Sequence, residues 1–348
     1  MSVQIKYLGL LTRYNGVDVE QTSQYVKIYN RTYIDKILEG HKSWMQEAYC
    51  HNQPIPMKAE AAYIRSLEQA TPPSNDIARI KLQRKMGINY RQVIGELIYA
   101  MVTCRPDISF PLIKLSQYST NPAEEHYQAA KEILYYLRCT KDEGITYWRP
   151  EHNKDLPSPL LSFEMEPDTE TKIQDDASLL RAATDSDWGG DTKHRKSVTG
   201  YVMKLAGGAI YYKSRFQPTI ALSSTEAEFV AATDAGKTIL YIRTILEELG
   251  LEQKDATILY IDNDGALNMA NQGQPTRNTR HMELKNFAIQ QWVERDLLVL
   301  RRITSQNNHA DAMTKVLGRT KFHQHFDYIM GRIKPVYADI HTGKFTEY

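Results

Sequence analysis

The chain has 348 residues and a mass of 40.1 kDa, with 42% hydrophobic and 24% charged side chains. This apolar content is enough for one large core or two ordinary ones and excludes a disordered or fibrous protein. Lysine and arginine number 43 against 42 aspartates and glutamates, a net charge of +1, so any contact with nucleic acid has to be local. The three cysteines form no CxxC pair, which excludes a disulfide framework and argues against a structural zinc site.

The N-terminal segment lacks the basic region and the apolar run of a signal peptide. No window approaches the roughly 20 apolar residues that cross a membrane, so we expect no membrane association. Residues 7–10 read as a buried strand with no polar segment before it. We therefore expect that further sequence precedes this segment in the natural protein.

The first half of the chain predicts strands followed by helices. Up to about residue 50 we expect strands, a turn at Asn15-Gly16 and a helix that starts at about Asn30. Residues 51–88 carry four prolines and stretches of charge, which predict a connecting segment rather than part of a core. The apolar spacing over residues 90–147 predicts a series of helices.

Residues 149–180 contain several prolines and many acidic residues, and we interpret them as a linker between two units. Beyond this linker the sequence predicts elements in the order β-β-β-α-β-α-α-β-α, a mixed sheet with helices around it. The expected strands lie near residues 180–187, 197–205, 209–212, 257–261 and 297–303, and the expected helices near 224–249, 265–270, 283–295 and after 309.

Four acidic residues sit where this sheet would bring them together. Asp185 and Asp262 end two strands, Glu228 lies in the first turns of a helix that can pack over the sheet, and Asp311 opens the last helix. Gathered carboxylates repel one another unless a divalent cation neutralises them. Two hard cations held by oxygen ligands would activate a water for an in-line phosphoryl displacement. The pattern therefore predicts a metal-dependent nuclease.

Each of these carboxylates has a structural alternative when taken alone. Asp311 could cap a helix. Glu226 competes with Glu228, but the two lie about 160° apart around a helix, so only one can face the site. His309 could shuttle a proton during product release, whereas residues 323–325, with the sequence HQH, are interpreted as surface. The four carboxylates together make the metal interpretation specific.

Six motifs stand in the second half of the chain: TDSDWGGD (184–191), RKSVTGY (195–201), QPTIALSSTEAEF (217–229), YIDNDGAL (260–267), TRHMELKNF (279–287) and HADAMTK (309–315). Their order and spacing resemble the RNase H domain of copia-type retroelement polyproteins. The resemblance implies an α/β fold with an RNase H-like mixed sheet flanked by helices. It places Asp185, Glu228, Asp262 and Asp311 on the family's acidic positions, which bind Mg²⁺ or Mn²⁺.

Residues 90–147, from YRQVIGELIY to DEGITY, are similar to the segment that follows the polymerase palm in the same polyproteins. Two shorter pieces, YLGL (7–10) and YIDKIL (33–38), are similar to the end of the palm. A truncated palm/thumb-like α+β region is thus implied before the RNase H domain. The chain has no Tyr-x-Asp-Asp motif, so we expect no DNA synthesis from this fragment alone. The implied divisions are a reverse-transcriptase remnant (1–148), the linker (149–180), the RNase H domain (181–318) and a C-terminal tail (319–348).

The resemblance also implies an activity and its partners. We expect a Mg²⁺-dependent endoribonuclease that cuts the RNA strand of an RNA–DNA hybrid by two-metal hydrolysis, beside upstream polymerase and integrase parts of a polyprotein that serves transposition. An inactive remnant or a hybrid-binding module is the alternative. A cytoplasmic virus-like particle or the nucleus would both fit. The candidate substrate contacts, for which a solvated loop or a structural histidine is the alternative, are Trp188, Lys193, Arg195, Lys196 and His281, with Lys213 and Arg215 expected nearby.

Overall fold

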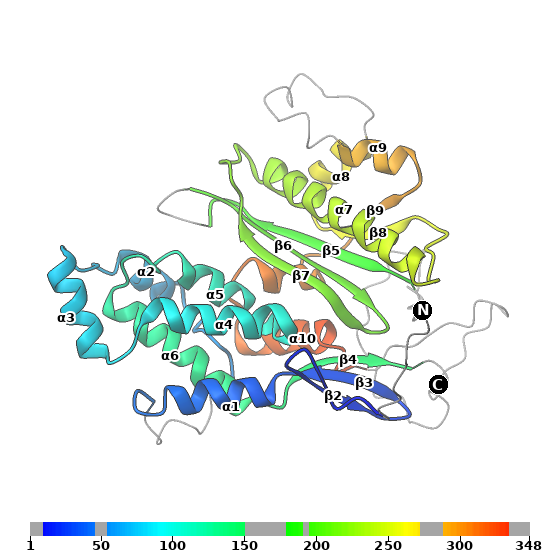
Figure 1. The fold of residues 1–348 in the computed structure, drawn as a ribbon. Helices are drawn as coiled ribbons and strands as arrows, with labels where there is room; N and C mark the ends of the chain where they lie inside the picture. The colour runs from blue at the N-terminus through cyan, green and yellow to red at the C-terminus, as the bar shows by residue number, and fades with distance from the viewer. Residues whose placement is uncertain (1–9, 46–53, 150–178, 191–194, 272–287, 334–348) are drawn as a thin grey trace, which may run out of the picture.

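The computed structural model describes residues 10–45, 54–149, 179–190, 195–271 and 288–333 (Figure 1). The first half of the chain builds a four-stranded antiparallel sheet in the order β1-β2-β3-β4. Asn15 and Gly16 join its first two strands with positive φ angles of 48° and 84°, as a tight hairpin turn requires, which confirms the predicted turn. The strands are β1 (Arg13–Tyr14), β2 (Val17–Gln21), β3 (Tyr25–Tyr29) and β4 (Gly144–Trp148).

One expectation for these strands was wrong, and a second falls mostly outside the described residues. β4 lies in the region that was predicted to be helical, and it pairs with β3 across more than a hundred residues of sequence. The strand predicted over residues 7–10 lies outside the described residues except for Leu10, whose side chain is 74% exposed rather than buried.

Six helices connect β3 to β4 within the described ranges. They are α1 (Arg31–Gly40), α2 (Ala61–Gln69), α3 (Asp76–Met86), α4 (Tyr90–Cys104), α5 (Ser109–Ser116) and α6 (Glu124–Cys139). Residues 51–88 were predicted to form a connecting segment outside any core. This prediction is wrong, because Met57, Leu67 and Met86 are buried in the same core as α4 and α6. The prolines of this stretch lie outside α2 and α3, where they do not disturb either helix.

The second half builds a five-stranded mixed sheet in the order β7-β6-β5-β8-β9. The first three strands in this order pair antiparallel, and β5, β8 and β9 run parallel. This is the RNase H-like α/β fold that the sequence predicted. The strands are β5 (Arg181–Asp187), β6 (Val198–Leu205), β7 (Gly208–Phe216), β8 (Thr257–Ile261) and β9 (Leu298–Arg302).

Both faces of this sheet are covered. Tyr201 and Met203 of β6 pack with α7 in one core, whereas Val202 between them belongs to the other core, because successive side chains of a strand point to opposite faces. Figure 1 shows α7 along one face and α4, α5 and α10 on the other side. The helices are α7 (Ser224–Glu248), α8 (Asp264–Asn271), α9 (Ala288–Glu294) and α10 (Arg319–Ile329), with a 3₁₀ turn at His309–Met313.

The C-terminal helix joins the two halves of the chain. Residues 319–329, which the sequence grouped with a tail, form α10, and Phe322 and Phe326 are buried in the core of the first half. His325 is fully buried, so its predicted surface position is wrong. The backbone N–H of Thr146 in β4 donates to Met330 O at 2.9 Å. Among the described helices, none combines the length and the apolarity that crossing a membrane requires.

Candidate metal centre

Three of the four predicted carboxylates meet at one edge of the larger sheet. Asp185 belongs to β5 and Asp262 directly follows β8, and these two strands are parallel neighbours, so both residues lie toward the carboxyl ends of their strands. Glu228 comes from the second turn of α7, which packs on β5. One side-chain oxygen from each of the three residues lies within 4.8 Å of the others. Oxygen donors this close form the kind of ligand set that a hard divalent cation prefers.

Local hydrogen bonds decide which glutamate of α7 faces the sheet. Ser223 caps the helix by accepting from the Glu226 N–H at 3.1 Å, and the Glu226 carboxylate accepts from the Leu222 N–H at 2.8 Å. Glu226 therefore stabilises the helix start. Glu228 is 5% exposed, and its Oε1 accepts from the Ser186 N–H at 3.0 Å. Its Oε2 has no hydrogen-bond partner among the described residues.

Asp311 lies beside this triad and is held by lysines. It belongs to a 3₁₀ turn rather than an α-helix, and Asn308, not Asp311, caps that turn. Lys315 Nζ lies 3.0 Å from Asp311 Oδ1 and 3.9 Å from Asp185 Oδ2, and Lys321 Nζ lies 2.8 Å from Asp311 Oδ2. Lys315 thus connects Asp311 to the triad.

A close contact between β6 and the 3₁₀ turn fixes the position of Asp185. Gly200 of β6 is paired with Asp185, and a Cβ added there would lie 2.6 Å from Met313 Cβ and from Thr314 Cγ2. The Thr314 hydroxyl donates a hydrogen bond to the Asp185 carboxylate. The glycine of the SVTGY motif therefore allows the approach that brings Thr314 to Asp185.

Burial and mutual repulsion make two carboxyls of the triad hard to ionise. Desolvation, followed by the neighbouring Asp185 and Asp262 charges, raises the pKa of Glu228 to about 9. Desolvation also raises the pKa of Asp185 to about 7, against the opposing effect of Lys315. A bound divalent cation would favour the ionised form of both groups.

The candidate substrate contacts are only partly described by the structure. Trp188 is half exposed, and its indole N–H donates to Ala221 O at 3.0 Å, in the loop that precedes α7. Arg195 is exposed and Lys196 is half-buried. Lys193 and His281 lie outside the described residues. The two further basic residues expected near this loop, Lys213 and Arg215, both form ion pairs with Asp234, at 3.2 and 3.1 Å.

His309 packs against other side chains in a way that the sequence did not indicate. Its Nδ1 lies 2.9 Å from Nδ1 of His325, and its ring stacks on Tyr328 with a centroid separation of 3.8 Å. Burial, then the neighbouring His325 and Lys204, hold the pKa of His309 well below its usual range. His309 is thus a packed side chain whose surroundings disfavour its protonation.

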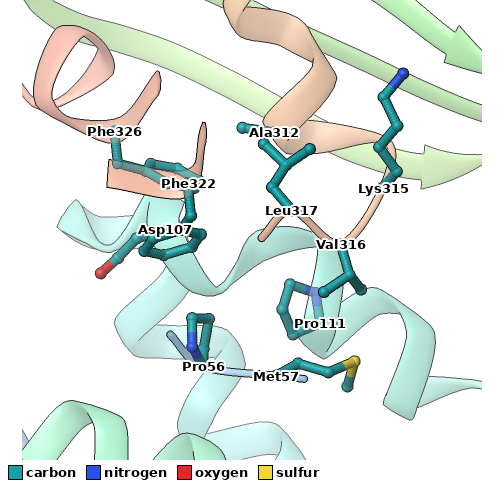
Figure 2. Close-up of a pocket in the computed structure, with 10 residues that line it drawn as sticks. All are labelled: Pro56, Met57, Asp107, Pro111, Ala312, Lys315, Val316, Leu317, Phe322 and Phe326. Atoms are coloured by element: carbon teal, nitrogen blue, oxygen red, sulfur yellow. The ribbon is translucent and has the colours of Figure 1, made fainter. Parts of the chain in front are cut away.

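A mainly apolar pocket lies behind the lysine-bearing segment (Figure 2). Leu317 and Phe322 line it from the C-terminal part of the chain, and Met57 and Pro111 line it from the first half. Figure 2 shows the Lys315 ammonium extending away from these apolar side chains. Lys315 therefore lines the same pocket as residues of the first half, while its ammonium group reaches the carboxylates. Lys315 was not among the predicted site residues, although its i,i+4 spacing from Asp311 was a usable signal.

The order and direction of the strands are those of the RNase H-like fold that the sequence predicted, and comparisons with known proteins show the family. No protein-family model matches the chain. The Retrovirus-related Pol polyprotein from transposon TNT 1-94 of Nicotiana tabacum is 30% identical over 324 residues, 92% of this chain. The corresponding polyprotein from transposon RE2 of Arabidopsis thaliana is 31% identical over 70% of this chain. The chain belongs to the Pol polyproteins of copia-type retrotransposons, and it spans 22% and 15% of the lengths of these two relatives.

Two other similarities are of limited extent. The Secreted RxLR effector protein 161 of Plasmopara viticola is 32% identical over 44% of this chain and 92% of its own length. Among solved structures, an RNase H1 isolated from compost by a metagenomic approach is similar over 39% of this chain and 93% of its own, with 16% identity and a TM-score of 0.32.

Proposed function

We propose that the chain is an RNase H-type endoribonuclease that cleaves the RNA strand of RNA–DNA hybrids as part of a retroelement reverse transcriptase. The observation that carries this proposal is the triad of Asp185, Glu228 and Asp262, in which a buried glutamate oxygen has no hydrogen-bond partner among the described residues. A buried oxygen of this kind is costly unless a ligand satisfies it. The RNase H-like sheet and the membership in a Pol family support the same activity.

The donor set fits Mg²⁺ or Mn²⁺, since all the available ligand atoms are carboxylate oxygens. Asp185, Glu228 and Asp262 would hold one ion, and Asp185 and Asp311 would hold a second. Two such ions would supply an activated water and stabilise the leaving oxygen of an in-line displacement. The Ser186 N–H would keep Glu228 oriented, and the Thr314 hydroxyl would keep Asp185 oriented.

An RNA–DNA hybrid would be recognised mainly by its shape and by its 2′-hydroxyl groups. Trp188, with the exposed Ile220 and Leu222 beside its Ala221 partner, would contact sugars or bases at the edge of the site. Arg195 and Lys196 would contact phosphates, as would Lys193, and His281 would contact the substrate. Upstream polymerase and integrase parts of a longer polyprotein would be the protein partners in transposition.

Cleavage of a labelled RNA–DNA hybrid by the purified chain tests this function. With Mg²⁺ we expect cutting that chelator abolishes, and we expect Asp262→Asn and Glu228→Gln each to lower the rate by roughly 10²–10³-fold, as loss of a preorganised catalytic group does. Glu226→Gln is the matched control, because its amide oxygen can still accept from the Leu222 N–H. It should retain cleavage.

Two outcomes would contradict the proposal. Equal loss in Glu226→Gln and Glu228→Gln would show that the triad is not the reacting centre. A folded chain that binds the hybrid in Mg²⁺ without cutting it would instead identify a hybrid-binding module or an inactive remnant of the retroelement.

A further inference from the structure

Asp311 is the most completely neutralised carboxylate of the centre. It is 1% exposed, and each of its two oxygens lies within 3.0 Å of a lysine ammonium, Lys315 on one side and Lys321 on the other. Among the described residues, no ion pair involves Glu228 or Asp262. The positive charges of the site are therefore concentrated on one member of the predicted carboxylate set.

The two lysines come from different places in the fold. Lys315 lies one turn after Asp311, and its stem lines the pocket between the two halves of the chain (Figure 2). Lys321 is in the first turn of α10, next to Phe322, which is buried in the core of the first half. The position of Lys321 is therefore fixed by packing outside the RNase H-like sheet.

Both lysine side chains are partly open to solvent, although the carboxylate that they contact is buried. The side chains of Lys315 and Lys321 are 42% and 39% exposed, whereas the Asp311 side chain is 1% exposed. A cation arriving at Asp311 from solvent would thus meet two bound charges that can rotate outward.

We propose that Lys315 and Lys321 are built-in counter-cations of Asp311, so that the free protein binds one divalent cation tightly at the triad and a second one only by displacing an ammonium group. This inference rests on the proposed function, because it concerns the same site. Breaking a close ammonium–carboxylate pair at a desolvated position costs free energy. A cation that has to break this pair therefore binds more weakly. The two cations therefore bind with different affinities, and the lysines set the difference.

The experiment is a titration of the whole chain with Mn²⁺ in the absence of nucleic acid. Binding is measured by calorimetry and by electron paramagnetic resonance. The wild type should show one tight site and a second site at least about tenfold weaker, in line with coupling between close charge pairs. Lys321→Met should strengthen the second site by about tenfold and leave the first nearly unchanged. Lys321→Arg keeps the charge and should resemble the wild type.

Two further variants separate this effect from a general loss of charge or of folding. Lys315→Met should also strengthen the second site, so the conclusion does not depend on one variant folding. Lys237→Met removes an exposed lysine of α7 and should change neither site. Two equal sites in the wild type, or a second site that neither methionine variant strengthens, would overturn the proposal. Failure of the folded wild type to bind any Mn²⁺ would count against the proposed nuclease itself and thereby against this inference.

Discussion

Burial, more than the number of acidic residues, distinguishes the carboxyls of this centre. Asp262 and Asp264 are two residues apart, yet Asp262 joins the triad, whereas Asp264 forms an ion pair with Arg302 at 2.7 Å on the surface. Desolvation is the first cause of the raised pKa values of Asp185 and Glu228, and the charges of neighbouring carboxylates, Asp262 among them, raise both pKa values further. The same two effects make the site costly to fold without a cation.

These pKa values predict how the stability of the metal-free chain depends on pH. Because Asp185 and Glu228 have folded-state pKa values of about 7 and about 9, above those of free carboxyls, the folded state binds more protons than the unfolded state between about pH 4 and pH 9. The free energy of unfolding should therefore fall as the pH rises, by up to about 1.4 kcal/mol per unit for each group.

Urea denaturation of the wild type and of Glu228→Gln, in chelator at about pH 5 and about pH 8, checks this expectation. The wild type should lose stability relative to the variant as the pH rises, and Mg²⁺ should restore it most at the higher pH. A difference between the two proteins that is constant with pH would show that Glu228 titrates normally.

At the level of single residues, the members of the triad were predictable from the sequence, whereas the side chains around the triad were not. Asp185, Glu228 and Asp262 each follow a local signal, a strand end or a helix start, so their convergence was predictable. Lys321 was not predictable, because its contact with Asp311 depends on how α10 packs on distant helices. His325 was wrongly interpreted as surface for the same reason.

At the scale of elements, the close approach between β6 and the 3₁₀ turn makes a sharp prediction for Gly200→Ala. The added Cβ would lie 2.6 Å from Met313 Cβ, so the 3₁₀ turn would have to move away from β6. Thr314 would then move away from Asp185 with the turn. We expect a loss of about 1–3 kcal/mol of stability, the usual cost of overpacking, and weaker Mn²⁺ binding.

Gly95→Ala in α4 provides the control, because nothing lies within 4 Å of a Cβ added there. This substitution should be neutral or stabilising, as replacement of a helical glycine by alanine usually is. Urea denaturation of both variants checks the contrast, and equal effects at the two glycines would show that β6 and the 3₁₀ turn are not in the contact described.

The elements themselves were predictable where the apolar pattern is local. β8 matches its predicted bounds, because an apolar run ends directly at polar residues. β7 instead continues beyond the predicted end at residue 212 to Phe216, since its pairing with β6 extends through polar positions such as Lys213 and Arg215. The end of β7 is therefore set by its pairing with β6, and the composition of the sequence could not predict it.

At the scale of the whole molecule, one of the two buried cores contains side chains from both halves of the chain, whereas the other belongs to the second half alone. The buried cluster that contains Ile34, Leu97 and Tyr136 also contains Phe322 and Phe326 of α10. The halves also share backbone hydrogen bonds, since β4 donates from Thr146 N to Met330 O and from Trp148 N to Ala206 O, at 2.9 and 2.8 Å. Sequence periodicity cannot reveal such packing, because it joins segments that are far apart along the chain.

This shared core predicts that the RNase H-like half does not fold well alone. Residues 179–348 expressed by themselves would expose Phe322, Phe326 and Met313, each of which contributes about 1.5–3 kcal/mol when buried. We expect this half to aggregate or to be loosely folded, and to recover folding and Mn²⁺ binding when residues 1–149 are expressed in the same cells as a separate chain. An affinity tag on residues 1–149 should then retain both pieces as a one-to-one complex in gel filtration. The prediction would be contradicted if residues 179–348 alone were monodisperse, unfolded cooperatively and did not bind residues 1–149. That result would mean that the fold of this half does not require the contact between α10 and the first half.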